Sequence, residues 1–131
     1  MRVTCLIVDD TPAFLAAASG LLERQGFIVV GTVTTGAEAL RQVAELHPDV
    51  VLVDIDLGGE SGLDVARLLH DGVGAPPVIL ISTHPEDDYA DLIAESPAVG
   101  FIPKIGLSAA AVSDMLARGL DRRDGQGRYP R

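Results

Sequence analysis

Side chains that could bind a cation or a phosphate group directly follow four separate apolar runs of this sequence. They are an acidic pair, two further aspartates, two hydroxyls and an ammonium: Asp9 and Asp10, Asp54 and Asp56, Ser82 and Thr83, and Lys104. Carboxylates brought together repel one another, so that protonation or a cation must relieve the repulsion. Their hard oxygen atoms suit Mg²⁺, which typically accepts one or two protein carboxylates together with phosphate oxygens.

Lys104 is the only lysine among the 10 lysine and arginine residues of the chain. Its compact ammonium suits a phosphate oxygen, and a chain that otherwise uses arginine has this group at one point only. An acidic pair or a Ser-Thr pair alone is often no more than a turn or a helix cap. The occurrence of all these groups after successive apolar runs is more specific.

The apolar runs have the length of β-strands, and segments with helical periodicity separate them. Their richness in Val and Ile favours strands, and their near-continuous apolar character favours a parallel sheet covered on both faces. The predicted strands comprise residues 3–8, 27–33, 50–54, 78–82 and 99–103. The helices between them are predicted to open at Thr11, Thr35, Ser61, Pro85 and Ser108. The apolar residues expected to face the core include Phe14, Leu40, Leu46, Leu68 and Leu92.

Five strand–helix units in succession predict a doubly wound parallel α/β sheet, because right-handed crossovers place helices on both of its faces. Ligands bind at the carboxyl ends of the strands in such sheets. The second strand ends in Val33-Thr34-Thr35 and offers no ionisable group. This fits the strand order 2-1-3-4-5, in which the second strand lies at an edge and the other four ends converge.

The overall composition limits the class of protein. A net charge of −9 argues against a nucleic-acid-binding surface, which needs a clustered basic face. Cys5, the only cysteine, lies in an apolar run, so we expect a buried thiol and no disulfide within the chain. No apolar run approaches the roughly 20 residues of a membrane span, and we expect a cytoplasmic protein without membrane contact.

Residues 1–120 are predicted to form one domain, and residues 121–131 a polar basic tail or the start of a linker. From residue 118 onward, five arginines stand against two aspartates, with few residues suited to a core. A frayed terminus and a linker to a further effector domain both fit this composition.

Four segments of the sequence resemble the receiver domains of bacterial two-component response regulators, the CheY-like family. The resemblance extends over residues 3–120 and implies a flavodoxin-like (βα)5 fold. The segments are residues 6–10 (LIVDD), residues 51–57 (VLVDIDL) with Gly62 eight residues after Asp54, residues 79–82 (ILIS) and residues 100–104 (GFIPK).

By that resemblance, Asp54 is the phosphoacceptor and Mg²⁺ is the cofactor. Asp10 and Asp54 would bind the ion directly, together with the backbone carbonyl of Asp56, while Asp9 would act largely through water. The phosphoryl oxygens would contact three further residues, which are Ser82, Thr83 and Lys104.

The resemblance also implies a switch and a set of partners. Ser82 would turn toward the phosphoryl group, and Phe101 would rotate into the space it leaves, changing the face formed by the fourth helix, fifth strand and fifth helix. A sensor histidine kinase would supply the phosphoryl group. A downstream protein or effector domain would bind the changed face, which could also join two copies of the chain. Such a protein is a signalling phosphoprotein and not an enzyme, apart from self-catalysed phosphotransfer and autodephosphorylation.

The sequence departs from the family pattern at four positions. Gly58, followed by Gly59, stands where the family usually has a proline, which predicts a looser loop. Ile105 replaces a proline that often follows the lysine, so we expect a trans bond or a reshaped loop there, because a cis bond without proline costs about 2.5–4 kcal/mol. Thr83 predicts a narrower phosphate pocket, and Pro103 lacks a backbone donor, which fits an edge strand.

Two other functions remain open at the level of sequence. Val53-Asp54-Ile55-Asp56 resembles the opening motif of haloacid dehalogenase-class phosphatases, in which Asp54 would be the nucleophile and Asp56 the general acid/base. Those enzymes place their acidic pair downstream of the lysine, whereas Asp9 and Asp10 lie upstream of it. A receiver that only binds partners without being phosphorylated is the second alternative. Against it, all five side chains expected for phosphorylation are present, which are Asp9, Asp10, Asp54, Ser82 and Lys104.

Overall fold

Five parallel strands form a single sheet in the order β2-β1-β3-β4-β5 in the computed structural model, which describes residues 2–72 and 74–128. The strands are β1 (Thr4–Val8), β2 (Ile28–Val33), β3 (Val50–Asp54), β4 (Val78–Ser82) and β5 (Gly100–Pro103). Each lies within one residue of its predicted bounds. The strand order and the doubly wound, flavodoxin-like class are therefore confirmed.

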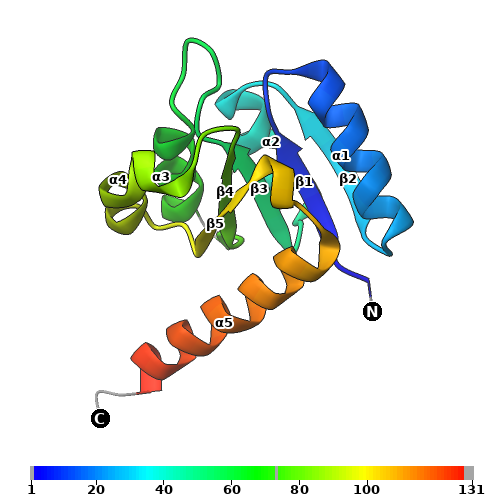
Figure 1. Ribbon diagram of the computed structural model, residues 1–131. Coiled ribbons are helices and arrows are strands. Elements are labelled where there is room, and N and C mark those ends of the chain that lie inside the picture. The colour runs from blue at the N-terminus through cyan, green and yellow to red at the C-terminus, as the bar shows by residue number, and fades with distance from the viewer. Residues whose placement is uncertain (1, 73, 129–131) are drawn as a thin grey trace.

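Helices cover both faces of the sheet, and each face has its own apolar core (Figure 1). The α-helices are α1 (Pro12–Arg24), α2 (Gly36–Leu46), α3 (Gly62–Asp71), α4 (Ala90–Glu95) and α5 (Ala109–Arg128), with two short 3-10 helices, η1 (Glu86–Tyr89) and η2 (Lys104–Gly106). One core contains Leu22 of α1 and Val112 of α5. The other contains Ala39 of α2, Val65 of α3 and Phe101 of β5, with the η1–α4 segment packed at its margin.

Three of the predicted helix starts are capped as expected. The side-chain oxygens of Thr35, Ser61 and Ser108 accept hydrogen bonds from backbone N–H groups of the following turn. The Thr11 side chain makes no such bond at the start of α1. Instead, Asp9 Oδ1 accepts the Thr11 N–H at 2.8 Å, so that Asp9 itself fixes this turn.

The predicted inward faces of three helices are partly wrong. Leu68 of α3 is 52% exposed. Leu40 and Leu46 of α2 are 37% and 41% exposed. At 3.6 residues per turn they point about 60° to either side of Val43, so they flank the buried stripe instead of filling it. The expected fourth helix is divided into η1 and a short α4. Tyr89 and Ile93 of this segment pack against the core as predicted, whereas Leu92 is 51% exposed at the margin of that face.

The fifth helix continues beyond the predicted domain boundary. It runs through residue 120 and ends at Arg128, and Figure 1 shows its last turns leaving the body of the protein. Residues 121–128 of the expected tail are thus helical, and residues 129–131 lie outside the described residues. None of the helices in the described part of the chain is long and apolar enough to cross a membrane.

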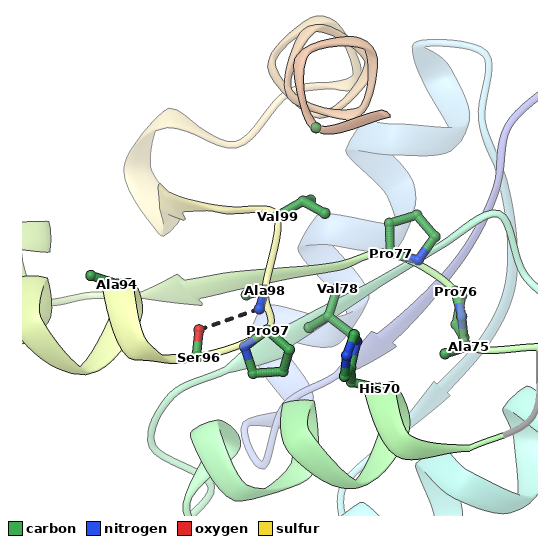
Figure 2. A pocket seen from close by; sticks show the side chains of 11 residues that line it. His70, Ala75, Pro76, Pro77, Val78, Ala94, Ser96, Pro97, Ala98 and Val99 are labelled. Atoms are coloured by element: carbon green, nitrogen blue, oxygen red, sulfur yellow. Dashed lines mark hydrogen bonds between the residues drawn. The ribbon is translucent and has the colours of Figure 1, made fainter. Parts of the chain in front are cut away.

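A cavity of about 430 Å³ lies at the amino ends of β4 and β5, at the opposite edge of the sheet from the acidic residues (Figure 2). Its wall is built largely of proline and small apolar side chains, and His70 at the end of α3 lines it. Ser96 Oγ accepts the Ala98 N–H at 3.3 Å and shapes the loop that enters β5.

Candidate functional site

Lys104 joins the two halves of the sheet at the carboxyl ends of the strands. Its Nζ atom lies 2.7 Å from Oδ2 of Asp9, which follows β1, and 3.1 Å from Oδ2 of Asp54, which ends β3. Asp9 is fully buried and Asp54 is only 5% exposed. The strand order places β3 and β4 between β1 and β5, so the lysine must reach back from the edge of the sheet to make both contacts.

The carboxylate of Asp54 is held at both of its oxygens. Oδ1 accepts the Asp56 N–H at 3.1 Å, and Oδ2 accepts a hydrogen bond from Lys104. Burial raises the pKa of Asp54 from 3.8 to about 6, although these two donors oppose the rise. Burial disfavours the charged form because a buried charge loses its hydration.

Lys104 remains an ammonium in this setting. Its side chain is 11% exposed, and burial alone would lower its pKa. The contacts with Asp9 and Asp54 outweigh burial, so that the pKa of Lys104 is raised above its ordinary value. The lysine therefore supplies a permanent positive charge between the two buried carboxylates.

A cluster of carboxylate oxygens suited to a cation adjoins this lysine. One oxygen each from Asp9, Asp10 and Asp54 lies within 4.8 Å of the other two. Apart from its close ion pair with Lys104, the buried Oδ2 of Asp9 has no hydrogen-bond partner among the described residues. Three ionised carboxylates against one ammonium leave two negative charges uncompensated. The donor set and this charge both fit a divalent cation with hard oxygen ligands.

The loop after Asp54 has a backbone conformation that proline cannot adopt. Gly58 has φ of +77°, whereas proline is restricted to about −65°. A Cβ atom on Gly58 would also lie 3.1 Å from Oδ2 of Asp10. A proline at position 58 is therefore incompatible with this loop, and the absence of a side chain there leaves room for the Asp10 carboxylate.

Gly62 allows the start of α3 to pack directly against the end of β3. Its N–H donates to the Ile55 carbonyl at 2.7 Å, and a Cβ at this position would collide with the backbone carbonyl of Asp54. The spacing of eight residues between Asp54 and Gly62 thus has a steric basis.

Glu60 is a residue of this region that the sequence did not single out. Its Oε1 accepts the Gly36 N–H at 2.9 Å, at the first turn of α2. The Leu57 N–H donates to the Glu60 carbonyl at 3.0 Å, so the same residue closes the loop on itself and ties it to α2. The contact joins positions 24 residues apart, and no local pattern in the sequence marks it.

Ser82 and Thr83 lie at the same edge, whereas Phe101 lies within β5 opposite Leu80, and among the described residues neither hydroxyl forms a hydrogen bond with Lys104. Ser82 is 1% exposed, and its Oγ accepts the His84 N–H at 3.0 Å. Thr83 is exposed, and Phe101 is 6% exposed within the core that adjoins α3. Within the described residues no peptide bond is cis, so Lys104–Ile105 is trans as predicted, and Pro103 lies on an edge strand as predicted.

Phe14 is a second residue that the sequence placed only in the core. The ring centroid of Phe14 lies 4.3 Å from Nζ of Lys104, which stands over the face of the ring. This contact connects α1 with the residue after β5, two segments far apart in sequence.

The family model described as "Response regulator receiver domain" matches residues 5–114. The chain belongs to this family. The match gives no support to the dehalogenase-class alternative, and the Asp56 carboxylate proposed there as acid/base accepts the Gly58 N–H of its own loop at 3.1 Å.

Curated relatives of this receiver domain carry further regions. It is 29% identical over 102 residues to the DNA-binding transcriptional activator EvgA of Escherichia coli K12, covering 78% of this chain and 50% of EvgA. It is 37% identical over 108 residues to the DNA-binding response regulator MtrA of Mycolicibacterium smegmatis, covering 79% of this chain and 45% of MtrA. The receiver domain thus spans about half the length of these relatives.

Solved structures show the same fold. The signal receiver domain of NarL from Mycobacterium tuberculosis superposes with a TM-score of 0.79 at 29% identity, covering 88% of this chain and 97% of that one. The signal receiver domain of a modulated diguanylate cyclase from Desulfovibrio desulfuricans G20 gives a TM-score of 0.78 at 26% identity, covering 96% and 99%.

Proposed function

We propose that this receiver domain is a phosphorylation switch that takes a phosphoryl group onto Asp54 from a sensor histidine kinase, with Mg²⁺ as cofactor. The observation that supports the proposal most directly is the bridge from Lys104 to both Asp9 and Asp54 at the carboxyl ends of the strands. It sets a nucleophile, a mobile cation and an acidic pocket side by side. Phosphoryl transfer requires such positioning and charge neutralisation more than it requires covalent chemistry from the protein.

Asp54 acts as the nucleophile. A pKa of about 6 leaves its carboxylate mostly ionised at neutral pH. One of its oxygens attacks the phosphorus atom, the P–N bond of the donor phosphohistidine breaks, and the histidine nitrogen keeps the electron pair. The product is an aspartyl phosphate that carries roughly −2 of charge where one carboxylate stood.

Lys104 and the hydroxyl groups bind the transferred group. Lys104 exchanges its contact with Oδ2 of Asp54 for the phosphoryl oxygens, and Ser82 and Thr83 supply the neighbouring hydroxyl donors. Bound by Asp10, Asp54 and the Asp56 carbonyl, with Asp9 acting largely through water, Mg²⁺ would neutralise the phosphoryl oxygens and hold the group in line. The two uncompensated negative charges of the acidic cluster motivate this assignment.

The switch consists of Ser82 and Phe101. Ser82 leaves its bond with the His84 N–H and donates to the phosphoryl group, which changes the turn before η1. Phe101 then moves toward the space beneath α4, and the face formed by α4, β5 and α5 changes. The receiver is in this scheme a signalling domain and not an enzyme that turns over substrate.

The output of the switch is a downstream protein or an effector domain that recognises the α4-β5-α5 face, and the same face serves a homodimer. The DNA-binding relatives motivate an effector domain joined through residues 121–131, with residues 1–120 as the receiver proper. The net charge of −9 supports an output in which this chain does not itself bind nucleic acid. The protein would act in the cytoplasm, where its kinase partner presents the phosphohistidine.

Intact-mass measurement with acetyl phosphate tests the assignment. Wild type should gain one phosphoryl group in the presence of Mg²⁺ and almost none after chelation. Asp54→Asn should gain none, with Asp64→Asn of the exposed face of α3 as the matched control that labels normally. Equal labelling of wild type and Asp54→Asn would overturn the assignment.

A further inference from the structure

The ammonium of Lys104 has an aromatic partner as well as its two carboxylate partners. The three groups come from separate segments: Asp9 follows β1, Asp54 ends β3, and Phe14 belongs to the first turn of α1. Nζ lies 4.3 Å from the centroid of the Phe14 ring. A cation over an aromatic face is attracted by the negative charge of the ring's π-system, and the attraction strengthens when the cation is shielded from water.

The requirements of the lysine explain why a third partner matters. An ammonium has three N–H donors, and two directions are taken by Asp9 and Asp54. The side chain is 11% exposed, so water has limited access to the remaining side. Ile105, the next residue, is 99% exposed and contributes nothing to this enclosure. The Phe14 ring therefore covers the side of the ammonium that neither the carboxylates nor Ile105 contact.

The ring is held in place by structure that the site already needs. Pro12 opens α1, and Asp9 Oδ1 fixes the turn before it through the Thr11 N–H. Phe14 also packs against the core formed by α1, α5 and the sheet, so that the ring is anchored below while its face meets the ammonium. A shift of α1 would move the ring and the acidic pair together.

We infer that Phe14 is a positioning residue for phosphoryl transfer, which holds the Lys104 ammonium at the level of Asp54 through its ring face. The inference rests on the proposed function of Asp54 and adds a residue to it. The lysine arm is long and flexible, and its carboxylate contact with Asp54 must be released when the phosphoryl group arrives. The uncharged Phe14 ring keeps the ammonium near the site during this exchange and does not compete with the phosphoryl oxygens as an ionic partner would.

The first test observes the lysine directly and does not depend on phosphorylation. Because Lys104 is the only lysine, isotope-labelled lysine gives one side-chain NMR signal, free of overlap. Protons above the face of an aromatic ring are shifted upfield, so the Hε protons should lie upfield in wild type and Phe14→Tyr. The Hε signal should move downfield in Phe14→Leu. It should not move in the control Phe27→Leu, which removes another ring of the core and leaves Phe14 in place.

The second test measures transfer. The rate of Asp54 labelling by acetyl phosphate with Mg²⁺ should fall about three- to tenfold in Phe14→Leu, the range expected for loss of one cation–π contact. Phe14→Tyr and Phe27→Leu should stay within about twofold of wild type. In a Lys104→Met background, Phe14→Leu should have no further effect, because a positioning residue acts only through the group that it positions.

The outcomes separate the inference from the proposed function. If wild type is not labelled at Asp54, the proposed function fails, whereas the NMR signal still reports whether ring and lysine are in contact. If wild type is labelled but Phe14→Leu is labelled equally fast, Phe14 does not position the lysine. If Phe14→Leu slows transfer by the same factor in the Lys104→Met background as in wild type, the ring has a structural role only and the inference is overturned.

Discussion

Helix α1 and the η1–α4 segment both follow a strand whose end lies at the site, yet the protein holds them very differently. Helix α1 spans Pro12–Arg24 and buries Leu15, Ala18 and Leu22 in the core. Residues 86–95 of η1 and α4 are all described, and none of them is buried. Side chains of α1 and its preceding turn contact Lys104, whereas the turn before η1 meets the site region through the bond between the His84 N–H and Ser82.

The negative charge of the η1–α4 segment makes it still less stable than α1. The η1–α4 segment carries five acidic residues and no lysine or arginine: Glu86, Asp87, Asp88, Asp91 and Glu95. Like charges four residues apart destabilise a helix, and Asp87, Asp91 and Glu95 have that spacing. Segments with little buried apolar surface open locally at low free-energy cost. We therefore regard α1 as the fixed wall of the site and η1–α4 as the part that a change at Asp54 can move.

The largest expected effect compares one leucine from each segment. Leu22→Ala should lower the free energy of unfolding by about 2–5 kcal/mol, because Leu22 is fully buried and its truncation leaves a cavity. Leu92→Ala should change it by no more than about 0.5 kcal/mol, since this side chain is 51% exposed. Urea denaturation followed by circular dichroism measures both. A comparable loss in the two variants would contradict the contrast between a fixed and a movable helix.

The second prediction asks which segment responds to phosphorylation. In wild type labelled with acetyl phosphate, amide exchange should change in residues 86–95 and remain unchanged in residues 12–24. Ser82→Ala should still accept phosphate but lose most of the response, since one charge-assisted hydrogen bond is worth about 1.5–3 kcal/mol, roughly ten- to a hundredfold in the active population. Ser113→Ala, on the exposed face of α5, serves as the control. A full response in Ser82→Ala would remove Ser82 as the coupling residue.

The third prediction concerns how stability depends on pH through the buried carboxyl group of Asp54. The folded-state pKa of Asp54 is raised from 3.8 to about 6, so the folded protein binds the proton more tightly than the unfolded chain does. Without divalent cations, this contribution to stability is fully present below pH 3.8 and is lost as the pH rises to about 6. Asp54→Asn should lack the decline and exceed wild type at pH 7 by about 1–3 kcal/mol in the free energy of unfolding. If the free energies of unfolding of wild type and Asp54→Asn follow parallel curves against pH, the raised pKa of Asp54 is disproved.

The smallest effect concerns the tie between the phosphoacceptor loop and α2. Glu60→Ala should lower the free energy of unfolding by about 0.5–2 kcal/mol, because the Gly36 N–H loses its acceptor at the start of α2. Glu60→Gln should recover part of the loss, since its side-chain oxygen can still accept. Glu45→Ala, an exposed acidic residue near the other end of α2, is the matched control. Equal stability of Glu60→Ala and Glu45→Ala would show that the contact contributes nothing.

The sequence alone determined the order of the five strands and the set of polar residues at their ends. Strand-length runs such as residues 50–54 are apolar throughout because both faces of a parallel strand are covered, and that pattern is visible without coordinates. The acidic pair, Asp54, Ser82 and Lys104 could be placed at one edge because parallel strands end there together. The missing proline at Gly58 and the isoleucine at 105 were also visible, and the trans bond after Lys104 followed from the latter, whereas the positive φ of Gly58 beside Asp10 did not.

Tertiary structure alone decided how those residues meet. The contacts of Lys104 with Asp9 and Phe14, and of Glu60 with Gly36, join segments separated by 24 residues or more. Local periodicity carries no information about such pairs, because only the packing of helices on the sheet brings them within reach. The division of the fourth helix into η1 and α4 and the exposure of Leu92 likewise follow from how little of that segment the core can cover. Burial in this assembled edge also sets the pKa of Asp54, since a charge loses its hydration only when the chain closes around it.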